Sequence, residues 1–305
     1  MATEGETRKG FARMFEQVVF AGGGQRCWWQ AGFWDAFAPA TGLAPKVVGA
    51  VSAGAATACM LLANDSRNGL AHYREVLAGS PRNAYWGNLL RRGAPVFPHE
   101  AIYRRALHTL LGGARFERLR QCGTDVRIAY ARPPKWPGTR TAVALGLAAY
   151  SLERSFVKPL HPTWGRRLGF TRHVGRLAEC PDVDSLVSLI VASSCAPPFT
   201  ALQHLDGKPA LDGGLVDNVP VDVVEPDRPI LVLASRRYPE RAPIFMLGMR
   251  TYVQPSRPIP VSRWDYTVPA LYEAVYRLGR KDGERAVAAI GRGRFIPVAA
   301  PSAAA

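Results

Sequence analysis

Ser52 stands at a junction that suits an activated nucleophile. It follows an apolar run and precedes small residues, in the order Ala50, Val51, Ser52, Ala53 and Gly54. A serine on a sharp turn between a strand and a helix exposes its hydroxyl, and the N-terminus of the helix behind it favours developing negative charge. The competing interpretation is an ordinary helix N-cap, a common position for serine.

Three consecutive glycines offer a second chemical group, in the order Gly22, Gly23, Gly24, followed by Gln25 and Arg26. Glycines after a strand leave backbone N–H groups free to converge on one point, as an oxyanion hole or a phosphate cradle requires. The run matches neither the dinucleotide fingerprint nor the nucleotide P-loop. Arg26 either holds this loop or contacts a lipid phosphate. A plain turn that needs positive φ is the alternative for the glycines.

An aspartate followed by two glycines completes the set. Asp212, Gly213 and Gly214 come after a short apolar run, where little obstructs the carboxylate. Asp-Gly pairs are also common in turns. We interpret the neighbouring Asp217 and Asp222 as turn or capping residues.

The elements that must position these groups alternate between strand and helix. Apolar runs at 17–20 and 46–51 predict buried strands, each followed by small residues and then by a helix, over 25–37 and 55–63. This repeated order indicates parallel strands joined by helices. We further predict a mostly helical, basic stretch at 65–120, strands at 125–131 and 229–234, an irregular insertion at 132–170, and helices at 183–192 and 264–290.

The composition is that of a folded chain without a disulfide framework. Of 305 residues, 48% are hydrophobic and 21% are charged, which allows a sizeable core. The five cysteines include no CxxC pair, which favours a reducing compartment and argues against a standard zinc site. No secretory signal is recognisable, and no apolar run reaches the roughly 18 residues of a membrane span. We therefore expect a cytoplasmic protein.

The net charge of +15 favours an anionic partner such as a membrane surface. Nucleic acid is not expected, because no RNA-binding or helix-turn-helix signature is present. The run 141–150 has two interpretations, a membrane-facing segment and a buried helix with basic flanks. Peripheral membrane association is supported by the mixture of apolar, aromatic and basic residues in 136–170, namely Trp136, Tyr150, Arg154, Lys158 and Trp164.

The three motifs, in this order, resemble those of the patatin-like phospholipase family. Residues 22–26 match the family's oxyanion loop, 50–54 its nucleophile elbow and 212–214 its aspartate motif, and 193–198 and 218–220 also look like family segments. The likeness extends from 17 to 290. It implies a three-layer α/β fold with a central, mostly parallel sheet flanked by helices. We expect one domain at 15–295 and flexible tails at 1–14 and 296–305.

The resemblance implies a lipid acyl hydrolase, a phospholipase A or carboxylic ester hydrolase, that needs no metal or organic cofactor. Ser52 is then the nucleophile, Asp212 its only catalytic partner, and residues 22–26 the oxyanion hole. Two residues depart from the family pattern: Ala50 stands where the elbow has glycine, and Cys27 where glycine is common. The methyl group of Ala50 motivates the alternative of a catalytically weak or silent lipid-binding protein of the same fold.

A Ser-His-Asp triad is a further alternative. The last histidine, His204, precedes Asp212, so Asp212 does not fit the α/β-hydrolase order. A triad of Ser52, His204 and either Asp182 or Asp184 stays open on the sequence. We interpret the six histidines as surface or core residues.

Overall fold

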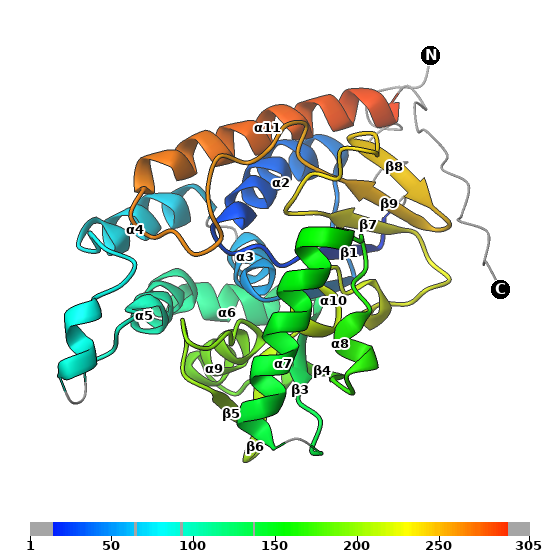
Figure 1. Ribbon diagram of the computed structural model, residues 1–305. Coiled ribbons are helices and arrows are strands. Elements are labelled where there is room, and N and C mark those ends of the chain that lie inside the picture. The colour runs from blue at the N-terminus through cyan, green and yellow to red at the C-terminus, as the bar shows by residue number, and fades with distance from the viewer. Residues whose placement is uncertain (1–14, 64–65, 92–93, 137, 292–305) are drawn as a thin grey trace.

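The computed structural model describes residues 15–63, 66–91, 94–136 and 138–291 (Figure 1). The tails predicted at 1–14 and 296–305, and the last four residues of the domain predicted at 15–295, lie outside the described residues. Among the helices of the described ranges, none has both the length and the apolar character needed to cross a membrane.

The described chain forms one nine-stranded sheet. This sheet confirms the predicted α/β class with a central, mostly parallel sheet. Its centre is five parallel strands in the order β3 (Asp125–Arg132), β2 (Val47–Val51), β1 (Gln17–Phe20), β7 (Ile230–Leu233) and β9 (Arg250–Val253). Antiparallel pairs extend it: β4 (Thr171–Arg176) and β6 (Lys208–Asp212) pair with β3, β5 (Gln203–Leu205) pairs with β6, and β8 (Ile244–Leu247) pairs with β9.

Successive residues of the central strands enter different hydrophobic cores. In β1, Val18 and Phe20 belong to the larger core, whereas Val19 belongs to a smaller one. In β7, Leu231 enters the larger core and Val232 the smaller one. Because side chains alternate between the two faces of a strand, both faces of the sheet are covered. This explains why these strands are continuous apolar runs in the sequence.

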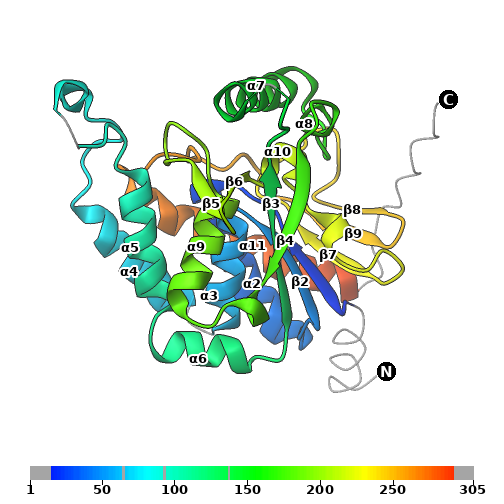
Figure 2. The same ribbon diagram turned by 90° about the horizontal axis from the view of Figure 1, so that it is seen from below.

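Helices flank the sheet on both sides, as the resemblance implied (Figures 1 and 2). The longest, α11 (Pro269–Gly291), lies along α2 (Trp28–Thr41) in Figure 1. Glycines allow this close approach, since a methyl group on Gly32 would lie 1.9 Å from the carbonyl oxygen of Tyr276. The other helical segments are η1 (Gly24–Cys27), α3 (Ala53–Leu62), α4 (Ser66–Ala78), η2 (Trp86–Leu90), α5 (His99–Leu111), α6 (Ala114–Gln121), α7 (Thr139–Leu152), η3 (Glu153–Val157), α8 (Trp164–Arg167), η4 (Leu177–Glu179), α9 (Val183–Ser193), α10 (Gly214–Asp217) and η5 (Val221–Val223).

The prediction of an irregular insertion at 132–170 was wrong, because this segment contains the 14-residue helix α7. The prolines that suggested irregular structure all lie before or after α7 in the sequence. Within α7, Ala142, Val143 and Gly146 are buried at helical spacing, while Leu145 and Leu152 on other faces are exposed. The run 141–150 is therefore a helix with one buried face and one open face.

The C-terminal helix begins later than the predicted residue 264. The carboxylate of Asp265 accepts hydrogen bonds from the backbone N–H of Thr267 at 3.0 Å and from its hydroxyl at 2.6 Å, which fixes a turn there. The helix then starts at Pro269, a residue that suits the first helical position because it has no N–H to leave unpaired.

Candidate active site

Ser52 occupies the sharp turn between β2 and α3. Its backbone has φ 55° and ψ −138°, a region that residues other than glycine rarely adopt. The backbone N–H of Ser52 donates to the hydroxyl oxygen of Ser193 at 2.8 Å, and that hydroxyl donates to the carbonyl of Ala129 at 2.6 Å. These bonds hold the turn against the end of β3. The N-cap interpretation does not apply to the Ser52 side chain, which makes no capping hydrogen bond.

The carboxylate of Asp212 lies at the end of β6, within hydrogen-bond reach of Ser52. The Ser52 Oγ donates to Asp212 Oδ2 at 2.9 Å, and the backbone N–H of Gly214 donates to Oδ1 at 2.7 Å. At Gly213, a methyl group would lie 2.6 Å from the carbonyl oxygen of Ala129. The two glycines therefore have separate local roles: one orients the carboxylate, and the other lets the chain pass close to β3.

Asp212 has an environment suited to accepting a proton near neutral pH. Burial raises the pKa of its carboxyl to about 6, against the opposing effects of the Gly214 N–H, the Ser52 hydroxyl and the positive charges of Arg263 and Arg154. A group with such a pKa is ionised at pH 7, yet it is a stronger base than an exposed aspartate.

In the glycine loop, residues 22–26, some backbone N–H groups are hydrogen-bonded within the protein and others are not. The N–H of Gly22 donates to the Asn218 carbonyl at 3.0 Å, that of Gln25 to the Arg263 carbonyl at 3.2 Å, and that of Arg26 to the Gly23 carbonyl at 3.3 Å. Within the described ranges, the N–H groups of Gly23 and Gly24 have no hydrogen-bond acceptor. Of the five residues predicted for an oxyanion hole, these two alone have backbone donors available for a ligand.

Asn218 is a positioning residue to which the sequence assigned no role. Its side-chain amide donates to the carbonyl of Gly22 at 2.7 Å, and the hydroxyl of Ser235 donates to the same oxygen. Gly24 has φ +56°, and a methyl group on it would lie 2.2 Å from the carbonyl oxygen of Arg263. The loop is thus fixed by residues from the second half of the chain.

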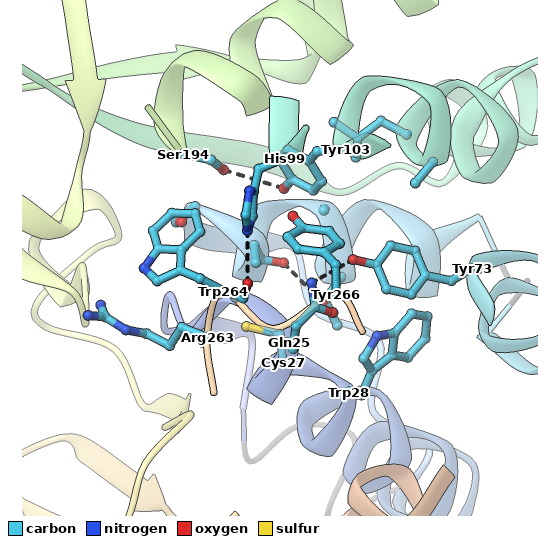
Figure 3. A pocket seen from close by; sticks show the side chains of 18 of the residues that line it. Gln25, Cys27, Trp28, Tyr73, His99, Tyr103, Ser194, Arg263, Trp264 and Tyr266 are labelled. Carbon is cyan, nitrogen blue, oxygen red and sulfur yellow. Dashed lines mark hydrogen bonds between the residues drawn. The ribbon is translucent and has the colours of Figure 1, made fainter. Parts of the chain in front are cut away.

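A mostly apolar cavity of about 870 Å³, including its opening to solvent, begins beside Ser52. Figure 3 shows Trp28, Tyr73, Tyr103 and Trp264 around it. The hydroxyl of Tyr73 accepts a hydrogen bond from Gln25 at 2.7 Å, so this polar group is satisfied within the wall. Five lining residues come from α5, where the sequence carried no motif, and α4 contributes Tyr73. Further lining residues are Ala56, Met60, Ala106, Leu107 and Leu110.

The histidines and the remaining acidic residues do not build a triad. His204 lies on β5 with an exposed side chain, and the structure gives it no hydrogen bond to Ser52. Asp182 caps α9 by accepting from the N–H of Ser185 at 2.7 Å, and Asp184 lies 3.6 Å from His108.

His99 lines the cavity, a role that its sequence context does not indicate. It is 1% exposed, and its Nε2 lies 2.8 Å from the carbonyl of Trp264 (Figure 3). Burial lowers the pKa of this imidazole below its usual range. Asp217 accepts from the Val219 N–H at 2.9 Å, which is the predicted turn role, and Asp222 forms an ion pair with Arg166 at 2.9 Å.

Comparison with known proteins identifies the family of this chain. A model of the family described as patatin-like phospholipase matches residues 18–224, and no curated protein matches. Among solved structures, VipD from Legionella pneumophila is similar, with a TM-score of 0.42 and 9% identity over 90% of this chain and 66% of VipD. The family match covers more than half of the chain and supports lipid acyl hydrolase activity in general. The chain belongs to the patatin-like phospholipase family.

Proposed function

We propose that this protein hydrolyses ester bonds of lipids, with Ser52 as nucleophile and Asp212 as general base. The observation that carries the proposal is the 2.9 Å hydrogen bond from Ser52 Oγ to Asp212 Oδ2 at the mouth of an apolar cavity. Such a cavity accepts an acyl chain, and its mouth places the ester carbonyl beside the hydroxyl.

We expect the reaction to proceed in two steps. Ser52 Oγ attacks the carbonyl carbon while its proton passes to Asp212, and the amides of Gly23 and Gly24 receive the oxyanion. Collapse of this intermediate expels the alcohol with a proton and leaves an acyl-enzyme. Water, activated by Asp212, then releases the fatty acid. Loss of one oxyanion donor typically raises the barrier by about 3–4 kcal/mol.

Ala50 was the reason to consider a silent lipid-binding protein. Its methyl group is fully buried in the larger core, and the Ser52 backbone has its strained conformation with alanine at position 50. The methyl group is therefore compatible with a sharp nucleophile turn, which supports an active enzyme over a silent one.

The test is hydrolysis of a p-nitrophenyl acyl ester together with fluorophosphonate labelling read by mass spectrometry. We expect Ser52→Ala and Asp212→Asn each to lower turnover by at least about 1,000-fold, as for residues that act as one unit. Ser80→Ala, a matched serine on the loop after α4, and His204→Ala should keep most of the activity. Labelling at a serine other than Ser52, or turnover that survives Ser52→Ala, would contradict the proposal.

We further propose that the protein acts at a membrane surface. Three large apolar side chains near α7 are open to solvent: Trp136 is 72%, Phe156 78% and Val157 56% exposed. A second exposed group, Trp86, Leu89 and Leu90, lies on η2. Figure 2 shows α7 and the cyan turn between α4 and α5, which contains η2, projecting from the same side of the molecule. Apolar tips amid basic residues suit the headgroup boundary of an anionic bilayer.

A further inference from the structure

Four arginines converge beside the candidate active site from separate parts of the chain. They are Arg26 on η1, Arg154 on η3, Arg236 after β7, and Arg263 before α11. All four side chains are half-buried. Burial, together with the positive charges of Arg154, Arg263 and Arg236, lowers the pKa of Arg26 to about 10, so the four charges lie within range of one another.

No carboxylate neutralises this cluster at contact distance. Among the described residues, no Asp or Glu oxygen forms an ion pair with any of the four guanidinium groups. Their partners are neutral oxygens instead. Arg154 and Arg263 both donate to the hydroxyl of Tyr150, at 3.1 Å and 3.0 Å. Arg26 donates to the Val261 carbonyl at 3.0 Å, and Arg236 to the Pro159 carbonyl at 2.5 Å.

The cluster adjoins the reacting atoms. Arg263 lines the apolar cavity together with Ser52 and Asp212. It also lines a neighbouring hollow with Tyr150 and Asp212, and a third hollow joins Tyr150, Arg154 and Arg236. Asp212 thus lies within the electrostatic range of Arg263 and Arg154, whose positive charges lower its pKa.

We propose that Arg154, Arg236 and Arg263 bind the phosphate of an anionic glycerophospholipid whose acyl chain occupies the apolar cavity. The inference rests on the proposed function. Guanidinium groups bind phosphate oxygens through paired, charge-assisted hydrogen bonds. The Tyr150 hydroxyl holds two of the three guanidinium groups in place before the ligand arrives. Since the cluster contains no acidic partner for a choline ammonium, the site favours headgroups that carry net negative charge.

The first test measures binding and does not depend on turnover. Ser52→Ala protein is titrated calorimetrically with dihexanoyl phosphatidylglycerol and, separately, with uncharged dihexanoylglycerol. We expect Arg154→Gln, Arg236→Gln or Arg263→Gln to weaken phosphatidylglycerol binding by about 10- to 100-fold, the range for lost hydrogen bonds to a charged group. Arg105→Gln removes the same charge from the exposed face of α5 and should change neither affinity. Equal affinity for the two lipids, or equal weakening for both, would overturn the proposal.

The second test separates a lipid headgroup from free phosphate. The wild-type chain hydrolyses phosphatidylglycerol and diacylglycerol of the same chain length in neutral detergent micelles, and the ratio of the two kcat/KM values is recorded. We expect the ratio to fall at least about tenfold in each arginine variant. A ratio near one in the wild type, with inorganic phosphate inhibiting diacylglycerol hydrolysis only when the arginines are present, would assign a free-anion site and reject the headgroup. Absence of turnover with selective binding intact would instead count against the proposed function alone.

Discussion

The two sides of the Ser52–Asp212 pair differ in chemical character: one is lined mainly by apolar side chains and the other by arginines. On one side, α4, α5 and α3 supply apolar and aromatic side chains around a cavity, and its polar groups are largely paired within the wall. On the other side, arginines that are far apart in the sequence donate to neutral oxygens, and two of them lie over tyrosine rings. The first side gains stability from packing and is completed by an acyl chain. The second stores unneutralised charge and is completed by an anion. We therefore expect the apolar side to select the length of the acyl chain and the arginine side to select the headgroup.

Blocking the apolar side should give the largest effect. Ala106 on α5 is 1% exposed and lines the cavity, so Ala106→Phe places a ring where an acyl chain is expected. We expect kcat/KM for long-chain esters to fall on the order of 100-fold, since each excluded methylene forfeits binding energy, while a p-nitrophenyl acetate substrate is affected much less. Ala101→Phe, exposed on the same helix, is the matched control. Equal losses for acetate and long chains would show that the cavity does not select chain length.

The pH profile distinguishes the two sides by charge. Because Asp212 must be ionised to accept a proton and burial raises its pKa to about 6, kcat/KM should rise with pH and level off above that value, changing about tenfold per unit below it. The positive charge of Arg263 lowers this pKa, so Arg263→Gln should move the midpoint to higher pH. Ala106→Phe should leave the midpoint in place. A midpoint that moves equally in both variants would mean that Arg263 does not act through its charge.

Substitutions on the exposed apolar surface near α7 should have the smallest effect, on membrane binding. Replacing Phe156 and Val157 together by serine removes exposed apolar surface next to Arg154 and Lys158. We expect binding to anionic vesicles to weaken by roughly tenfold, from the apolar area no longer buried in lipid. Met249→Ser, 46% exposed on the β8–β9 turn, serves as the control. Co-sedimentation with phosphatidylglycerol vesicles measures the effect, and unchanged binding of the double variant would remove this surface from consideration.

The motifs around Ser52 and the three glycines could be predicted because each lies where a buried apolar run of the sequence ends. The buried strands around Val18 and Val48 are continuous apolar runs, and each ends where small residues begin. Each change from apolar to small residues indicates a turn. The turns that follow parallel strands lie at the same edge of the sheet. Ser52 and the glycine loop share this edge for that reason. Asp212 is not placed in this way, because β6 is antiparallel to β3; the register that pairs Asp212 with Tyr130 leaves its carboxylate 2.9 Å from the Ser52 hydroxyl.

The walls of the site were not predictable in the same way. Tyr73, Tyr103 and Leu110 lie on helices whose pattern serves packing, and nothing local distinguishes a side chain that faces a cavity from one that faces a core. Arg154 and Arg236 come together only through tertiary folding, and arginine is common throughout this basic chain. Helix α7 was not predicted because prolines flank it on both sides in the sequence, and prolines so close together are typical of irregular structure.

The position of Arg263, far along the chain from the glycine loop, has a consequence for folding. Its carbonyl accepts the N–H of Gln25 and packs against Gly24, while Trp29, one turn further on, donates to Asp282 of α11 at 2.9 Å. The serine turn joins β2 to α3, whereas the contacts that shape the amide pocket need Arg263 and the segment that follows it. The amide pocket is therefore completed only when segments more than 200 residues apart in the sequence have come together, and a local stretch around the glycines cannot form it alone.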